Sequence, residues 1–193
     1  MEGQISRRGS GPLAEGDAVV VERKVLILGL GNTLLSDDGI GIYAARELKE
    51  RLRGTKGVEV DETEAWGLSL LEKMVGYEQV VIVDAVKTGG ARPGTVYRLS
   101  LEDLGGSYCH PSSHKANLPY LVELGKAAGL DVPRRVTLLA VEVEVVDRFG
   151  EGLSPGLRGK WADIVAELLA QVTSLLATSP PGPGGQPGGD TCP

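Results

Sequence analysis

The chain has 193 residues, of which 41% are hydrophobic, so it can bury one sizeable core without needing a second domain. A formal net charge of -6 and a pI near 5.0 argue against a nucleic-acid-binding surface, which needs clustered Lys and Arg. Cys109 and Cys192 are far apart and support neither a disulfide framework nor a cysteine-based zinc site. No apolar run approaches the roughly 18 residues of a membrane span, and the N-terminus lacks a signal peptide's apolar core. We expect a cytoplasmic monomer that contacts neither membranes nor nucleic acid.

The two ends of the chain differ in composition from its middle. Residues 1–22 show no sustained apolar periodicity, which predicts a flexible N-terminal extension. Residues 178–193 are mostly Pro and Gly, a composition typical of a disordered tail. The sequence therefore predicts one folded domain over residues 23–177.

The first strongly patterned stretch is an apolar strand at residues 25–28, followed by a glycine-rich loop and an amphipathic helix at 40–52. The acidic pair Asp37-Asp38 lies just before this helix, and either side chain could cap it. Ligands of open α/β sheets bind beyond the carboxyl ends of the strands. The acidic pair is therefore expected to point into the active cleft.

Strand and helix patterns alternate along the rest of the chain. A second strongly apolar strand, residues 80–85, places Asp84 at its carboxyl end. The later half of the strand at 136–146 alternates carboxylate with valine, which predicts one solvated face. The remaining expected elements are a strand at 58–61, a helical stripe at 66–75, an edge strand at 95–99, a helix at 117–128 and a final helix at 157–176. This alternation predicts an α/β fold.

Three residues, Asp38, Asp84 and His114, each end a predicted strand or open a helix at what should be one edge of the sheet. Two carboxylates and one imidazole are a plausible set of ligands for a divalent transition metal. The residues also allow simpler roles, because a strand-end Asp often stabilises a loop and a lone His is often a loop residue. Asp37 or Asp38 could also form an acid/base pair with Asp84 without any metal.

A dinucleotide-binding fold would also begin with strand, glycine turn and helix. Its G-x-G-x-x-G fingerprint is incomplete here, because Leu34 occupies the third glycine position after Gly29 and Gly31. The acidic pair would also repel a pyrophosphate at the helix N-terminus. This alternative is disfavoured.

Residues 29–41, GLGNTLLSDDGIG, resemble the opening motif of the nickel–iron hydrogenase maturation endopeptidases, also called hydrogenase-processing proteases. The resemblance continues in order through IVDA at 82–85, Pro93-Gly94, Ser113-His114 and GLSP at 152–155. It covers roughly residues 24–176. It implies an α/β three-layer sandwich with a mostly parallel, five-stranded twisted sheet flanked by helices.

The resemblance also implies roles for particular residues. In that family a carboxylate of the first motif, the strand-end Asp and a His bind a metal, which by position are Asp38, Asp84 and His114. His114 is preferred to His110 because Leu118 follows it at the family's spacing. Substrate-binding or loop-shaping roles are implied for Gly29, Gly31, Asn32, Asp37 and Gly39.

The function implied by the resemblance is an aspartic-type endopeptidase that removes a C-terminal extension from the precursor of a hydrogenase large subunit after nickel insertion. The Ni²⁺ would be supplied by the substrate, and another divalent ion could occupy the site in vitro. Either Asp38 or Asp84 could act as the general base, or the metal could polarise the carbonyl or the water; the sequence does not choose. A non-catalytic nickel-binding chaperone is the main alternative, ahead of a dinucleotide enzyme.

Overall fold

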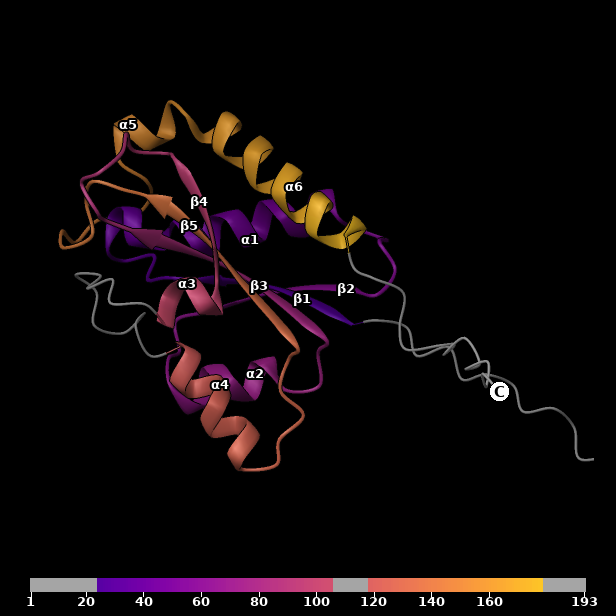
Figure 1. Cartoon of the computed structure of the whole chain (residues 1–193). Helices are drawn as coiled ribbons and strands as arrows, with labels where there is room; N and C mark the ends of the chain where they lie inside the picture. Colours follow the sequence, from indigo (N-terminus) through magenta and orange to yellow (C-terminus); the bar gives the residue numbers. More distant parts are fainter. Residues whose placement is uncertain (1–23, 106–117, 179–193) are drawn as a thin grey trace, which may run out of the picture.

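The computed structural model describes residues 24–105 and 118–178. Within these ranges five strands form one sheet in the order β2-β1-β3-β5-β4 (Figure 1). Neighbouring strands run parallel except for β4, which pairs antiparallel with β5 at the edge. The strands are β1 (Val25–Leu30), β2 (Val58–Thr63), β3 (Gln79–Val86), β4 (Val96–Ser100) and β5 (Arg135–Glu142). The predicted mostly parallel five-stranded sheet is confirmed.

Helices cover both faces of the sheet and make three layers (Figure 1). One face carries α1 (Ile40–Arg51) and α6 (Trp161–Ala177), and the other carries α2 (Leu68–Met74) and α4 (Leu118–Ala127). Two short helices, α3 (Leu101–Gly105) and α5 (Pro155–Arg158), complete the described helices together with the 3-10 turn η1 (Ser36–Gly39). The three-layer α/β prediction is therefore confirmed.

The central strands are apolar throughout because both of their faces are covered. In β1, Leu26 and Leu28 belong to the core under α2 and α4, whereas Ile27 belongs to the core under α1 and α6. All six residues of β1 and all eight of β3 are buried. Sandwiched parallel strands therefore appear in the sequence as continuous apolar runs instead of alternating patterns.

Helix α1 lies unusually close to the sheet because two glycines leave room for it. A Cβ at Gly29 would overlap the carbonyl oxygen of Gly41, and a Cβ at Gly41 would overlap the carbonyl oxygens of Leu30 and Val83. Side chains at either position would push the helix away from β1 and β3. The two glycines thus set the start of α1 directly on the carboxyl ends of these strands.

Strand β5 differs from its prediction in length and in exposure. It ends at Glu142 instead of residue 146, because the following backbone bonds elsewhere: the N–H of Val143 donates to the carbonyl of Val86, and the N–H of Val145 donates to Asp37. The predicted solvated face is wrong for Glu142, which is only 1% exposed. Glu144, the other carboxylate of the alternation, is exposed as predicted, so the alternation holds one buried and one solvated carboxylate.

The other helix boundaries also show where local patterns fail. The final helix was expected to be continuous, but Gly159 and Lys160 separate α5 from α6. The expected capping of α1 by Asp37 or Asp38 is wrong, because Gly39 occupies the N-cap position and no side chain bonds there. Both carboxylates make other contacts.

None of the described helices is long and apolar enough to cross a membrane.

Candidate active site

The order of the strands creates a switch point between β1 and β3. From β1 the chain passes through α1 to β2 on one side, whereas β3 lies on the other side of β1. Crevices at such points, beyond the carboxyl ends of the strands, are the usual ligand sites of open α/β sheets. Turn η1, which carries Asp38, follows β1 and contacts β3, which carries Asp84 near its carboxyl end. The structure therefore brings these two predicted ligands to the same edge.

The loop between β1 and η1 is shaped by close backbone approaches. Gly31 has φ +144°, and a Cβ there would overlap the carbonyl oxygen of Asp38. A Cβ on Gly39 would lie 2.9 Å from the Cα of Thr33. Glycine at both positions lets η1 fold back over the loop, which sets the height of Asp38 above the sheet.

Asp38 is held by the loop that precedes it. Its Oδ2 accepts a hydrogen bond from the backbone N–H of Asn32 at 3.0 Å. The side chain of Asn32 in turn accepts from the N–H of Leu34 at 2.9 Å, which closes a tight turn. No hydrogen bond joins Oδ1 of Asp38 to any other residue in the described ranges, so this oxygen is available to a ligand.

Asp84 lies deeper than Asp38. It is 2% exposed, and its Oδ1 accepts the N–H of Ala85 at 2.7 Å. A carboxylate buried this far loses much of its hydration, so a positive charge beside it gains interaction energy. Asp84 is thus suited to hold a cation at the edge of the sheet.

Asp37 has a different role from Asp38. It is fully buried, and its two oxygens accept the backbone N–H groups of Ser154 at 2.6 Å and Val145 at 3.1 Å. Its own N–H donates to the carbonyl of Val145 at 3.1 Å. Because both oxygens accept main-chain donors, Asp37 shapes the loops and is unavailable for an acid/base pair with Asp84.

Glu142 is a third buried carboxylate at this edge, after Asp84 and Asp37, and sequence reasoning missed it. Its Oε1 accepts the N–H groups of Thr88 and Gly89 at 2.8 and 2.9 Å, and its Oε2 accepts the hydroxyls of Thr88 and Tyr97 at 2.6 and 3.2 Å. Burial alone would raise the pKa of the Glu142 carboxyl, but these hydrogen bonds outweigh it and leave the pKa below its ordinary value.

The Glu142 network fixes the loop that follows Asp84. Besides its side-chain bonds at Thr88 and Gly89, the backbone of Glu142 bonds to Gly94 and Thr95 at the loop's far end, both at 2.8 Å. The signal in the sequence was a carboxylate inside an apolar strand, which is rarely left without partners. The alternation of carboxylate and valine was interpreted as a solvated face instead, so this role of Glu142 was not predicted.

The third predicted ligand, His114, lies outside the described residues, as does the competing His110. Within the described ranges no three His, Cys, Asp or Glu side chains are grouped so that they could hold a metal ion. The described part of the site therefore supplies two carboxylates. The three-residue ligand set stays a prediction.

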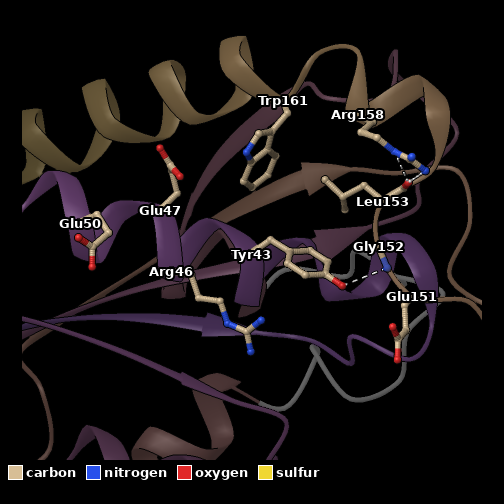
Figure 2. A pocket seen from close by; sticks show the side chains of 9 residues that line it. All are labelled: Tyr43, Arg46, Glu47, Glu50, Glu151, Gly152, Leu153, Arg158 and Trp161. Carbon is tan, nitrogen blue, oxygen red and sulfur yellow. Dashed lines mark hydrogen bonds between the residues drawn. The ribbon is translucent and has the colours of Figure 1, made fainter.

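A pocket of about 640 Å³ lies between α1, the loop before α5 and the start of α6 (Figure 2). Tyr43 lines it, and its hydroxyl accepts the N–H of Gly152 at 3.1 Å. Arg46 also lines it but is paired through two hydrogen bonds with Glu62. Neither Asp38 nor Asp84 lines this pocket, so its size alone does not make it the candidate active site.

Sequence comparison relates this chain to known proteins. Residues 42–171 match the family model of the hydrogenase maturation proteases, HycI. The hydrogenase 2 maturation protease of Escherichia coli (strain K12) is 27% identical over 157 residues, covering 81% of this chain and 92% of the relative. The HupD hydrogenase expression/formation protein of Thiocapsa roseopersicina is 27% identical over 155 residues, covering 77% of this chain and 68% of the relative.

A similar fold is found among solved structures. The solution structure of an endopeptidase from Escherichia coli has a TM-score of 0.64 at 25% identity, covering 79% of this chain and 93% of that one. The fold and the carboxylates at the switch point are those of an open α/β protein with a site for a small ligand or ion. The family match spans well over half of the chain, which therefore belongs to the hydrogenase maturation protease family.

Family membership confirms the resemblance inferred from the first motif and places the chain among hydrolases that cleave peptide bonds. It also argues against the dinucleotide alternative, which rested on the strand, the turn with Gly29 and Gly31, and the following helix. These glycines are explained by the close packing of η1 and α1.

Proposed function

We propose that this chain is an endopeptidase that removes a C-terminal extension from the precursor of a nickel–iron hydrogenase large subunit, after nickel has been inserted. The family supports a protease role. The observation that carries the site is the placement of Asp38 and Asp84, on contacting elements, at the switch point of the sheet. The substrate is a protein, and the reaction takes place in the cytoplasm on a monomeric enzyme.

The proposed metal ligands are Asp38, Asp84 and His114. Carboxylate oxygens and one imidazole nitrogen suit Ni²⁺, and another divalent ion could take its place in vitro. Two carboxylates at one edge repel each other, and a cation between them relieves that repulsion. When bound, the ion would act as a Lewis acid at the scissile carbonyl and anchor the nickel-loaded precursor.

The protein's own groups would orient and activate the reactants. The N–H of Asn32 holds Oδ2 of Asp38, so its Oδ1 can accept a proton from the attacking water. Asp84 is the alternative base, which makes the reaction aspartic in type. The loop pinned by Glu142 borders Asp84 and keeps the edge in one conformation.

The decisive experiment compares a nickel-loaded precursor with the same precursor lacking nickel and follows the precursor's mass. Only the loaded precursor should shorten, because its bound nickel can be coordinated by the three-residue site and so anchor the precursor there. Asp38→Asn should abolish cleavage, since it removes the charge with little change of volume. Asp131→Asn is the matched control, because Asp131 is exposed before β5, at the opposite edge of the sheet.

The outcomes separate the alternatives. Equal cleavage of both precursors would refute nickel gating and leave the peptidase assignment intact. A chain that binds Ni²⁺ but never cuts a cognate precursor would be a nickel-binding chaperone. Cleavage by the Asp38→Asn variant at the wild-type rate would remove Asp38 from the chemistry.

A further inference from the structure

Two large apolar side chains lie exposed beside the candidate active site. Leu34 is 54% exposed and Phe149 is 85% exposed. They are 115 positions apart in the numbering, yet a parallel β-bridge joins Leu35 to Gly150, the residues that follow them. Parallel register therefore sets Leu34 and Phe149 at neighbouring positions. An exposed phenylalanine beside an exposed leucine is an apolar surface that has no role in the core.

The two backbone segments that carry this surface are hydrogen-bonded to each other. The N–H of Gly150 donates to the carbonyl of Leu34 at 3.0 Å, and the N–H of Ser36 donates to the carbonyl of Gly150 at 2.9 Å. Asp37 fixes the same two segments to each other through Val145 and Ser154. A backbone that is already held in place has little further entropy to lose on binding, so only the side-chain rotamers have to be ordered.

The surface is continuous with the predicted catalytic carboxylate. The N–H of Leu34 bonds to the side chain of Asn32, and the N–H of Asn32 bonds to Asp38. Leu34 is therefore linked to Asp38 through a single residue, Asn32, and lies close enough for a peptide bound at Asp38 to reach it. Charged residues around Phe149, namely Asp147, Arg148 and Glu151, are exposed and form a polar rim. An apolar centre with a polar rim is the usual anatomy of a protein interface.

We propose that Leu34 and Phe149 form a docking surface for apolar side chains of the hydrogenase precursor within a few residues of its scissile bond. This inference rests on the proposed function. Phe149 is the main anchor, because aromatic side chains contribute most to such contacts, and Leu34 widens the surface toward Asp38. Neither residue takes part in the chemistry, so their contribution is to binding and not to the catalytic step.

The test measures KM and kcat for cleavage of a purified nickel-loaded precursor. Phe149→Ser should raise KM about tenfold while kcat changes less than about twofold. Phe149→Leu should restore most of the affinity, because it keeps an apolar side chain. Leu34→Ala should raise KM as well. Leu130→Ala is its matched control and should change neither constant, because Leu130 is 43% exposed but lies before β5 at the opposite edge.

A photo-crosslinking residue at position 149 would identify the occupant directly. The crosslink should fall on the precursor within about ten residues of its cleavage site, given an extended chain of roughly 3.3 Å per residue. Crosslinks to a distant part of the precursor, or between two copies of this chain, would overturn the proposal. So would unchanged KM in the Phe149→Ser and Leu34→Ala variants of an enzyme that cuts normally. If the wild-type protein cuts no precursor, the proposed function fails, and this inference fails with it.

Discussion

The carboxylate of Asp37 accepts a hydrogen bond of 2.6 Å from the backbone N–H of Ser154, which lies 117 residues further along the chain. This bond joins the first motif to the loop before α5, and the Asp37 side chain that accepts it is fully buried. Within the described residues, the Asp38 side chain hydrogen-bonds only to Asn32 in its own loop. Adjacent carboxylates thus have separate tasks: Asp37 joins distant segments, and Asp38 stays open to a ligand.

Asp37→Asn should destabilise the fold by about 3 kcal/mol, because the new amide group would face a buried backbone donor that needs an acceptor. Urea unfolding followed by circular dichroism measures this loss. Asp38→Asn is the control and should cost less than about 1 kcal/mol, since its remaining oxygen can still accept from Asn32. Equal losses in the two variants would contradict the division of tasks.

Glu142→Ala should cost about 3 kcal/mol, because it removes the buried acceptor of four hydrogen bonds, from the N–H groups of Thr88 and Gly89 and from the hydroxyls of Thr88 and Tyr97. Glu142→Gln should cost only about 1 kcal/mol. Its amide oxygen can accept from the two N–H groups, and its NH₂ can donate to the hydroxyls of Thr88 and Tyr97. Equilibrium unfolding at neutral pH compares the three proteins, and a Gln variant as unstable as the Ala variant would show that the charge itself is needed.

The contribution of Glu142 should depend on pH in a definite direction. The folded-state pKa of Glu142 is lowered, so its stabilisation is fully present above the unfolded pKa, about 4.3. That stabilisation is lost as pH falls through the folded pKa. The stability difference between the wild type and Glu142→Gln should therefore shrink below about pH 4. Melting temperatures of both proteins from pH 3 to 7 test this. A stability difference that grows toward acidic pH would contradict a lowered pKa of Glu142 in the folded state.

Gly41→Ala should destabilise the protein by about 3 kcal/mol or prevent folding, because its Cβ would overlap two carbonyl oxygens of the sheet. The helix start would have to move away from β1 and β3. Gly159→Ala is the control, since its φ is −66° and its nearest neighbour would lie at 3.6 Å. Thermal melting and soluble yield compare the two, and a tolerated Gly41→Ala would show that α1 has more room than the packing indicates.

The proposed ligand set can be tested without cleavage. Calorimetric titration with Ni²⁺ should show affinity reduced at least about tenfold by Asp38→Asn, Asp84→Asn or His114→Ala. His110→Ala is the control and should bind as the wild type does. A loss of binding in the His110 variant with normal binding in the His114 variant would exchange the two histidines.

The sequence alone determined the α/β class, the order of the five strands and the main helices along the chain, and the edge on which Asp38 and Asp84 lie. These features follow from local patterns: apolar runs long enough for buried strands, glycines at a tight turn, and carboxylates at the carboxyl end of a strand or in the loop that follows it. The chain direction of parallel strands then places all such ends on one edge. Nothing beyond neighbouring residues is needed for these inferences.

Only the tertiary structure decided what the buried carboxylates do. Asp37 and Asp38 look equivalent in sequence, and Glu142 looks like part of a solvated alternation, because the partners of Asp37 and Glu142 are main-chain N–H groups and hydroxyls far along the chain. A backbone N–H is present at nearly every residue, so the sequence does not show which of them will bond to a given carboxylate. The neighbouring positions of Leu34 and Phe149 depend in the same way on a backbone bridge between two loops. Such contacts exist only once the sheet has brought the loops to one edge.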